Sequence, residues 1–277
     1  MTTYRTATLS DLSLILHWAA DEGWNPGVDD AEAFFAADPD GFFVAVEQDM
    51  PVASISVVNH SSDFAFLGLY IVRKEFRRRG IGLGLWKHAL EHAGSRTVGL
   101  DGVEAQQDNY RASGFAYSGA TTRFNGRLTE RISRDIRAVD PQEIPTLIQM
   151  EAAASGVSKP NYLRPWFLGS SERSTIVKVK GDQSASLGFC TIRRCQTGAK
   201  IGPLVAADAD VVHELIAHAA TGIDGPISID VPSTSIALTE LCHTMGWQPG
   251  FQTARMYKGE FDASEYSCFA VTSLELG

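Results

Sequence analysis

A basic, glycine-punctuated turn is the part of this sequence whose residue types most directly indicate chemistry. Residues 73–79 hold five basic side chains against one acidic side chain, although the whole chain of 277 residues has a net charge of −9. The apolar residues 67–72 are typical of a buried strand, and residues 83–90 carry apolar side chains at helical spacing. Gly80 and Gly82 therefore lie where a strand meets a helix, and backbone N–H groups at such a junction bind anions. The turn is predicted to hold the phosphates of a cofactor.

The spacing of residues in the turn narrows the choice of cofactor. It contains neither the G-x-x-x-x-G-K-[ST] of a P-loop nor the G-x-G-x-x-G of a dinucleotide site. The sequence Arg77-x-x-Gly80-x-Gly82 instead resembles the [R/Q]-x-x-G-x-[G/A] signature by which the GNAT N-acetyltransferase superfamily binds acyl-coenzyme A. The resemblance implies that the cofactor is acetyl-coenzyme A (acetyl-CoA), with its pyrophosphate on the amides of the turn and its pantetheine arm along the preceding strand. The cofactor-binding residues so implied are Leu69, Tyr70, Ile71, Val72, Arg77, Arg78, Arg79, Gly80, Ile81 and Gly82.

A tyrosine downstream of the turn is the candidate acid. The family usually shows Y-x-x-x-G-F at this distance, and this chain has Tyr110 followed by Gly114 and Phe115. The resemblance implies that Tyr110 protonates the coenzyme A thiolate as it leaves. Two nearby positions depart from the family pattern, because Val103 replaces the usual asparagine and Gln106 replaces the usual alanine. Helix packing and substrate contacts in this region are therefore expected to differ from those of the family.

Attack of an amine on a thioester also needs a proton acceptor, because an alkyl amine is mostly protonated at neutral pH. Many GNAT enzymes carry a glutamate in the fourth strand, but residues 64–68 have no ionisable side chain here. Asp101, at the end of the fifth strand, is the first alternative for the base and Glu22 is the second, although either could simply cap a turn. The family's strand end implies that a backbone N–H near Ile71 or Val72 stabilises the thioester oxyanion, unless it makes an ordinary ladder bond.

The acceptor is expected to bind between the loop of residues 21–29 and the second half of the chain. An acidic protein favours a cationic acceptor such as a small amine, whereas arginine side chains would instead recognise a carboxylate, as in an amino acid. Both alternatives stay open at this point. The polar and aromatic side chains selected for this site are Glu22, Trp24, Tyr162, Trp166, Arg194, Asp230 and Arg255.

Composition is that of an ordinary globular protein. The chain is 44% hydrophobic and 21% charged, and it is long enough for one large or two modest cores. No apolar stretch reaches the roughly 18 residues that span a membrane, and residues 1–5 lack a signal-peptide pattern, so a cytoplasmic protein is expected. The cysteines Cys190, Cys195, Cys242 and Cys268 lack C-x-x-C spacing, which predicts buried thiols rather than a metal site or disulfides.

The two halves of the sequence repeat the same order of elements. A short strand and a helix with an acidic cap open each half, and the paired strands of residues 42–59 recur over residues 175–193. The fold class predicted is α/β (α+β), with two tandem GNAT-like domains, each a mixed, mostly antiparallel sheet flanked by helices. The expected domains are residues 1–130, which carry catalysis, and residues 131–277, which are degenerate.

The second half lacks the residues that the donor site needs. Cys242 stands where the first half has Tyr110, and the junction after residue 205 carries Asp208 and Asp210 without a glycine. Carboxylates at that junction repel phosphates, so one active site per chain is expected. The second half either contributes to the acceptor site or only covers a sheet edge.

Nearly the whole chain resembles a subfamily of tandem GNAT proteins in which a complete acetyltransferase domain precedes a degenerate one. The predicted activity is acetyl transfer from acetyl-CoA to a primary amine of a small molecule, by a monomer or a homodimer. A non-catalytic acyl-CoA-binding sensor is the alternative from another class. Nucleic acid and membrane are not expected partners, because the chain is acidic and has no extended basic face interleaved with aromatics. The segments that carry the subfamily resemblance are residues 25–27, 38–42, 100–103, 200–204, 229–232 and 253–257.

Overall fold

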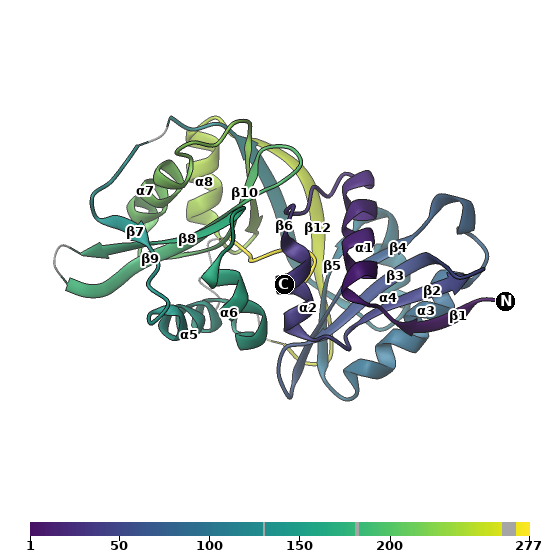
Figure 1. Cartoon of the computed structure of the whole chain (residues 1–277). Helices are drawn as coiled ribbons and strands as arrows, with labels where there is room; N and C mark the ends of the chain where they lie inside the picture. Colours follow the sequence, from purple (N-terminus) through teal and green to yellow (C-terminus); the bar gives the residue numbers. More distant parts are fainter. Residues whose placement is uncertain (130, 181–182, 262–269) are drawn as a thin grey trace.

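The strands form one continuous sheet in a computed structural model that describes residues 1–129, 131–180, 183–261 and 270–277. The order across the sheet is β1-β2-β3-β4-β5-β12-β6-β11-β10-β9-β8-β7. Figure 1 shows the two halves of the chain side by side, with β6 and β12 between them. The strands are β1 (Thr3–Thr6), β2 (Phe42–Glu47), β3 (Met50–Asn59), β4 (Phe64–Val72), β5 (Thr97–Val103), β6 (Ala116–Gly126), β7 (Ile136–Ala138), β8 (Arg173–Lys180), β9 (Gln183–Arg194), β10 (Ala199–Ala206), β11 (Ile227–Pro232) and β12 (Gln248–Lys258).

Helices cover both faces of the first half of the sheet. Alternate residues of β2 pack in different cores, because Phe42 contacts the core under α1 and α2, whereas Phe43 contacts the core under α3 and α4. In the second half, α7 and α8 pack on β9, β10 and β11. The α-helices are α1 (Leu9–Asp21), α2 (Asp30–Ala37), α3 (Ile81–Leu90), α4 (Gln107–Ala112), α5 (Ile144–Ser155), α6 (Pro160–Leu168), α7 (Ala209–Ala219) and α8 (Ile236–Thr244).

The sheet confirms the internal repeat and adds an exchange of strands. In each half four antiparallel strands lead to a parallel pair, β4 with β5 and β10 with β11. The last strand of each half then pairs with the other half, because β12 lies beside β5 and β6 lies beside β11. The predicted mixed α/β class with two GNAT-like units is confirmed, and the exchanged strands join the units into one sheet.

Local sequence explains how the first half begins. The Thr8 side chain caps α1 by accepting from the backbone N–H of Asp11. The Asp11 carboxylate accepts from the backbone N–H of Thr8, and the two bonds form a capping box. The two-residue turn between β2 and β3 places both Gln48 and Asp49 at positive φ, which suits the twist of a hairpin. Helix α3 begins at Ile81, two residues before the apolar periodicity indicates, because the turn before it ends at a glycine in the left-handed conformation.

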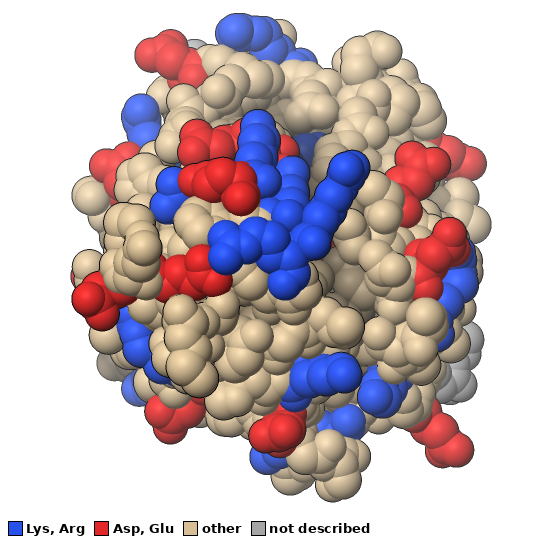
Figure 2. All heavy atoms as spheres, turned by 90° about the vertical axis from the view of Figure 1, so that its right-hand side faces the viewer, with Lys and Arg blue, Asp and Glu red and all other residues tan. Residues whose placement is uncertain are grey.

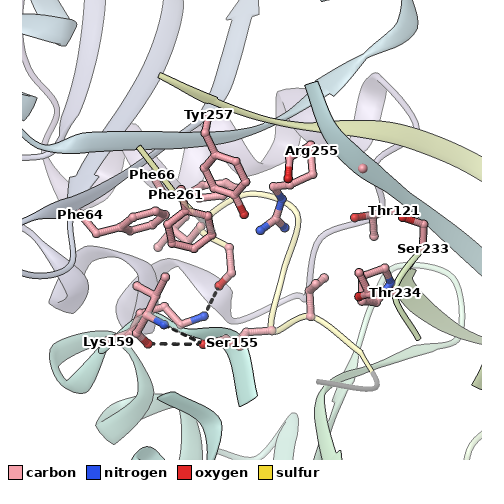
Figure 3. Close-up of a pocket in the computed structure, with 18 of the residues that line it drawn as sticks. Phe64, Phe66, Thr121, Ser155, Lys159, Ser233, Thr234, Arg255, Tyr257 and Phe261 are labelled. Carbon is pink, nitrogen blue, oxygen red and sulfur yellow. Dashed lines mark hydrogen bonds between the residues drawn. The ribbon is translucent and has the colours of Figure 1, made fainter. Parts of the chain in front are cut away.

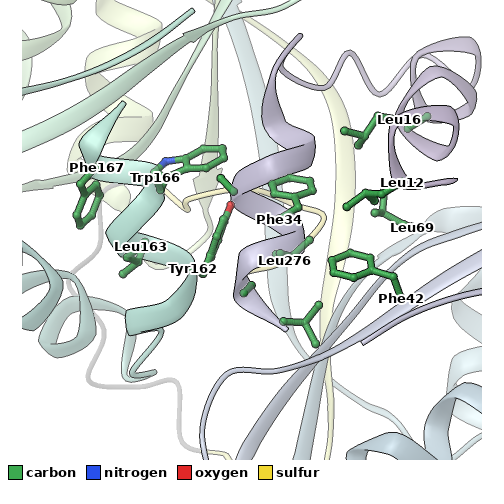
Figure 4. Close-up of a cluster of buried hydrophobic side chains, with 14 of the residues drawn as sticks. Leu12, Leu16, Phe34, Phe42, Leu69, Tyr162, Leu163, Trp166, Phe167 and Leu276 are labelled. Carbon is green, nitrogen blue, oxygen red and sulfur yellow. The ribbon is translucent and has the colours of Figure 1, made fainter. Parts of the chain in front are cut away.

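A shared core packs the two halves together. It contains residues of α1 and α2 from the first half and of α5 and α6 from the second half (Figure 4). Phe34 on α2 stacks on Trp166 of α6 with ring centroids 5.9 Å apart, and it meets Tyr162 edge-on at 5.8 Å. Aromatic pairs of this geometry contribute about 0.5–1.5 kcal/mol beyond the area they bury. The relative position of the halves is therefore held by packing as well as by strand pairing.

Cys190, Cys195 and Cys242 are buried free thiols, as expected, and Cys268 lies outside the described residues. Among the described residues no group of three or more His, Cys, Asp or Glu side chains is arranged to hold a metal ion. No helix in this part of the chain is long and apolar enough to cross a membrane.

Candidate active site

The strands β4 and β5 separate halfway along their length. They pair in register from Phe64 with Thr97 to Leu67 with Leu100, and no pairing between them follows in the described chain. A β-bulge in β4 accompanies the separation, and Leu69 adopts a φ of +47°, which is strained for a residue with a side chain. The edge of β4 over residues 69–72 that faces β5 is left open.

A buried hydrogen bond fixes the bulge. Ser54 of β3 donates through Oγ to the carbonyl oxygen of Leu69 over 2.8 Å. An unpaired buried carbonyl would cost about 1–3 kcal/mol, so this contact stabilises the conformation that opens the strand edge. β3 therefore positions the part of β4 that faces the gap.

The basic turn presents backbone N–H groups at the start of α3. Gly80 is the N-terminal cap residue of this ten-residue helix, with φ +78°, and no side chain caps it. Gly82 is held close to its neighbours, because a Cβ at this position would lie 2.6 Å from the hydroxyl oxygen of Tyr70 and 2.9 Å from Cγ2 of Val72. The first N–H groups of α3 thus have no capping side chain among the described residues, and the turn passes close to β4 at a position that only glycine fits.

The three arginines of the turn have different partners. Arg77 donates through Nε to the carbonyl oxygen of Val72 over 2.8 Å and through Nη2 to Glu22 over 2.5 Å. Arg79 pairs with Glu47 over 2.9 Å, whereas Arg78 is exposed and forms no ion pair within the described residues. Figure 2 looks at the side of the molecule that carries β1 to β4, and it shows Lys and Arg side chains gathered beside a hollow, with acidic side chains around them.

A groove of about 700 Å³, the donor groove, runs from this turn to the gap between β4 and β5. Its size is in the range of ligand sites in proteins. Leu69 lies next to it in an adjoining chamber, and Arg79 lines neither cavity. The residues of the donor groove are Glu22, Trp24, Tyr70, Ile71, Val72, Phe76, Arg77, Arg78, Gly80, Ile81, Gly82, Leu83, Val103, Ala105, Gln106, Asn109 and Phe251.

A smaller chamber of about 60 Å³, the inner chamber, adjoins the donor groove beside β4 and β5. Trp24, Tyr70 and Phe251 line both cavities, so the two are neighbours. Side chains from both halves of the sequence meet here. The inner chamber is lined by Trp24, Leu67, Gly68, Leu69, Tyr70, Leu100, Asp101, Val103, Gln106, Tyr110, Arg123, Phe251, Thr253, Leu274 and Glu275.

Tyr110 on α4 faces the inner chamber. Its ring stacks on Trp86 of α3 with centroids 5.5 Å apart, and it packs so closely on Gly102 that a Cβ there would lie 2.8 Å from the ring. Burial raises the pKa of Tyr110 well above its ordinary value, and the nearby Tyr70 adds to the rise. The hydroxyl has no hydrogen-bond partner among the described residues. At neutral pH it carries a proton that it can donate into the chamber.

Asp101 lines the same chamber, but an arginine from the exchanged strand holds its carboxylate. Arg255 on β12 donates through Nε over 3.0 Å and through Nη2 over 2.6 Å, and Thr253 donates over 3.2 Å. Burial raises the pKa of Asp101, while Arg255 and Thr253 act against that rise. Both oxygens are occupied, so the geometry suits Asp101 to holding β12 in place.

The loop between α1 and α2 is anchored from both halves of the chain. The carbonyl oxygen of Trp24 accepts from Nη1 of Arg123 over 2.9 Å and from Nζ of Lys200 over 2.8 Å. Arg123 in turn makes a buried, two-bond ion pair with Asp230. Of the residues predicted for the acceptor site, Trp24 and Glu22 therefore line the donor groove, and Asp230 supports the loop from behind.

The remaining residues predicted for the acceptor site lie elsewhere. Tyr162 and Trp166 are fully buried in the core between the halves, where the Tyr162 hydroxyl donates to Ser273 over 3.2 Å. Arg194 is exposed, lies 3.8 Å from Glu172, and borders a separate depression. The structure therefore brings Glu22, Trp24 and Asp101 to the site with Tyr110. It places Tyr162, Trp166 and Arg194 apart from that site.

Arg255 lines a third cavity of about 90 Å³, the aromatic chamber, on the other side of its ion pair with Asp101. Figure 3 shows Phe64, Phe66, Tyr257 and Phe261 on one side of this chamber and Thr121, Ser233 and Thr234 on the other. Because Asp101 lines the inner chamber and Arg255 lines the aromatic chamber, their ion pair separates the two.

The junction in the second half that corresponds to the basic turn is blocked. Asp208 caps α7, and its carboxylate accepts from the backbone N–H of Val211 over 2.9 Å. The helix N-terminus that would face a phosphate is thus already satisfied by an anionic side chain. Cys242 is buried at the position equivalent to Tyr110, where its carbonyl oxygen accepts from Trp247 as that of Tyr110 accepts from Phe115.

Arg123, Phe251 and Glu275 are among the residues of the inner chamber that were not predicted from the sequence. They come from β6, β12 and the segment that ends the chain. Their place at the site follows from the exchange of strands, for which the repeat pattern offers no signal.

Comparison with known proteins agrees with this geometry. Residues 9–118 match the description "Acetyltransferase (GNAT) family", and residues 147–270 match "Acetyltransferase (GNAT) domain". The chain is 31% identical to the holothin acyltransferase of Pseudoalteromonas sp. (strain SANK 73390) over 280 residues, which span 99% of this chain and 94% of that relative.

Solved structures share the fold. A putative acetyltransferase from Pyrococcus horikoshii superposes with a TM-score of 0.82 at 20% identity, over 100% of this chain and 96% of that one. A tandem GNAT protein from the clavulanic acid biosynthesis pathway superposes with a TM-score of 0.62 at 14% identity, over 95% of this chain and 100% of that one. This chain belongs to the GNAT acetyltransferase family, as an acyltransferase with two GNAT domains in tandem.

Proposed function

We propose that the protein transfers the acetyl group of acetyl-CoA to a primary amine of a small molecule. The observation that carries the proposal is the arrangement of the start of α3, the edge of β4 that β5 leaves unpaired in the described chain, and Tyr110 along two adjoining cavities. Residues 1–130 are proposed as the catalytic domain and residues 131–277 as a degenerate GNAT domain that supplies β12 to the site.

The residues of the donor groove fit the parts of acetyl-CoA. The N–H groups after Gly80 and the guanidinium groups of Arg77 and Arg78 supply donors for the pyrophosphate, and Arg79, which is next in the turn but does not line the groove, adds positive charge. The open edge of Leu69, Tyr70, Ile71 and Val72 offers backbone groups to the pantetheine amides, as in pairing with an added strand. We assign the thioester carbonyl to a backbone N–H near Ile71 or Val72, where the developing oxyanion would be stabilised.

Tyr110 is proposed as the general acid. When bound, acetyl-CoA supplies an acetyl group activated as a thioester. The phenol is protonated at neutral pH because burial raises its pKa, and it faces the chamber at the inner end of the groove. Donation of its proton to the departing sulfur avoids the release of a free thiolate into a buried site, a role worth about 10²–10⁴ in rate.

The acceptor is proposed to be a small molecule because the inner and aromatic chambers are small, about 60 and 90 Å³. The relative in Pseudoalteromonas is named for holothin, which makes holothin one compound to include among the acceptors tested. Carboxylates line both the inner chamber and the mouth of the groove, at Asp101, Glu275 and Glu22, and this favours an amine over an acidic acceptor.

Thiol release tests the proposal. Acetyl-CoA is incubated with the protein and a panel of alkyl amines, aromatic amines, amino acids and holothin, and coenzyme A is followed as free thiol. We expect thiol release that depends on an amine, with the acetylated amine formed in equal amount. Binding of acetyl-CoA without thiol release for any acceptor would contradict the proposal and would favour an acyl-CoA-binding sensor instead.

A further inference from the structure

The segment of residues 270–277 lies directly on β4 beside the bulge. Gly68 permits this approach, because a Cβ at that position would collide with the carbonyl oxygen of Glu275. Both halves of the chain fasten the segment: His60 contacts the carbonyl oxygen of Leu276 over 2.7 Å, and Lys159 donates to that of Gly277 over 2.8 Å. The backbone of the segment is thus held independently of the Glu275 side chain.

The carboxylate of Glu275 is buried without an ion-pair partner among the described residues. The residue is 3% exposed, Oε2 makes no hydrogen bond, and neither oxygen forms an ion pair with the described residues. The buried carboxylates Asp101, Asp230 and Glu151 differ, because each pairs with a cation over 2.6–2.8 Å. Asp30 also has an oxygen without a hydrogen bond in the described structure, but it lies 3.3 Å from Arg193 and 3.5 Å from Arg173. An unpaired buried carboxylate is costly, and such groups are retained where function uses them.

Cations surround Glu275 without contacting it. The carboxylate acts electrostatically on Arg123, Arg193 and Lys200, but each of these cations already has other partners. Arg123 binds Asp230 and Trp24, Arg193 lies 3.3 Å from Asp30, and Lys200 donates to Trp24. The cations supply a positive field around the carboxylate, while none of the described cations forms an ion pair with its oxygens.

The position of Glu275 matches that of a proton acceptor. It lines the inner chamber together with Tyr110, so one group that can donate a proton and one that can accept it face the same small space. The other carboxylate of that chamber, Asp101, has both oxygens occupied by Arg255. Glu22 lines only the donor groove, where it is paired with Arg77.

We propose that Glu275 is the general base that takes the proton from the acceptor amine. The inference rests on the proposed function. The amine nitrogen forms a bond to the acetyl carbon while the carbon–sulfur bond breaks. Where the acceptor is an ammonium ion, its nitrogen loses two protons: Glu275 takes the first before attack, and solvent takes the second once the bond to carbon has formed. The sulfur takes its proton from Tyr110. Solvent then restores both groups, so no further reactant is needed. The second half of the chain thereby contributes one of the two proton-transfer groups.

Two amines of nearly equal shape separate a base from a structural carboxylate. Ethylamine is an ammonium ion at neutral pH and methoxyamine is mostly a free base, so only the first needs a base before attack. In Glu275→Gln, which keeps the size of the side chain, we expect kcat/KM for ethylamine to fall about 10²–10⁴-fold at neutral pH. The loss for methoxyamine should stay below about tenfold, and the loss for ethylamine should shrink as the pH approaches the pKa of the amine.

The pH profile must be compared with a control because several groups surround Glu275. The charged and titratable groups that interact with it or share its chamber are Asp30, Tyr70, Asp101, Tyr110, Arg123, Tyr162, Arg193, Cys195 and Lys200. Asp30→Asn removes a buried carboxylate from the same group of charges but from a residue that lines neither the inner chamber nor the donor groove. This control should affect both amines by the same factor at every pH.

Three results would overturn the base role. If Glu275→Gln impairs both amines equally at every pH, the carboxylate is structural. If both rates stay within about threefold of wild type, it has no catalytic role. If wild type releases thiol with neither amine nor any other acceptor, the proposed function fails and the base role fails with it, which distinguishes that outcome from the first two.

Discussion

At the scale of single residues, the chemistry depends on protonation states that burial sets. The phenol of Tyr110 is buried against Trp86, which raises its pKa, and the carboxylate of Glu275 is buried without an ion-pair partner among the described residues. The two groups come from different halves of the sequence and line one chamber. The pair combines a group that keeps its proton with a group that can receive one, as acid–base catalysis of amide formation requires.

Replacement of Tyr110 by phenylalanine should separate chemistry from binding. Phenylalanine retains the stacking on Trp86, so affinity for acetyl-CoA should stay within about twofold, while kcat falls about 10²–10⁴-fold. Because burial raises the pKa of Tyr110, wild-type activity should not decline between pH 7 and 9 through ionisation of this phenol. Steady-state kinetics checks both statements. The exposed Tyr117→Phe is the control, and a rate for Tyr110→Phe within about threefold of wild type would rule out the acid role.

At the scale of elements, the site is built where two strands part and a helix begins. The bulge at Leu69, held by Ser54, opens the edge of β4, and the turn that ends at Gly80 presents the start of α3. Each feature depends on a backbone conformation rather than on a reactive side chain. Element geometry therefore determines where a cofactor would lie, and side chains determine what happens there.

Gly82 tests the turn at this scale. A methyl group at this position would meet the hydroxyl of Tyr70 at 2.6 Å, so Gly82→Ala should push the turn from its place and weaken acetyl-CoA binding about tenfold or more. Tyr70→Phe removes the oxygen that collides. The double variant should therefore bind acetyl-CoA more tightly than the sum of the two single losses in binding free energy predicts. Calorimetry on wild type, both single variants and the double variant would measure this difference as a coupling energy. Additive losses would mean that Gly82 does not act through this contact.

His60 tests how the segment of residues 270–277 is fastened. Burial lowers the pKa of His60 to about 3, and Lys159 adds to the effect, so the folded protein holds a neutral ring against Leu276. The unfolded chain takes up a proton below about pH 6.5, so stability falls as the pH falls below that value, by about 2 kcal/mol at pH 5. In His60→Gln, the free energy of unfolding measured with denaturant should depend less steeply on pH. The reduction in slope should correspond to about one proton fewer taken up on unfolding. An unchanged slope would show that His60 titrates normally in the folded protein.

The sequence predicts those parts of the site that act through nearby residues. The turn of residues 77–82 and Tyr110 could be proposed from the sequence because each belongs to a short motif with fixed spacing. Arg255 and Glu275 meet Asp101 and Tyr110 only because β12 and the end of the chain cross into the first half, and no local pattern records that crossing. Residue type alone does not distinguish a tryptophan that binds a ligand from one in the core. Trp166 was predicted to bind the acceptor, but α2 packs on α6 and buries it in the core.

At the scale of the whole molecule, we propose that the first half binds acetyl-CoA and that the second half completes the site with β12. The exchange of β6 and β12 means that neither half has its full sheet alone, and the core around Phe34 and Trp166 packs the halves together. The second half has kept the order of elements, but Asp208 occupies the helix start that would face a phosphate. The second half can therefore keep the repeated order of elements while it lacks a donor site and supports the site of the first half.

Calorimetric titration with acetyl-CoA tests the central claim, that the chain holds a single donor site at the basic turn. The account predicts one molecule bound per chain, with affinity about tenfold weaker in Arg78→Ala, whose side chain is exposed and unpaired in the described structure. Arg111→Ala, which removes an exposed arginine outside the groove, should leave affinity unchanged. Two molecules bound per chain, or none, would contradict the account.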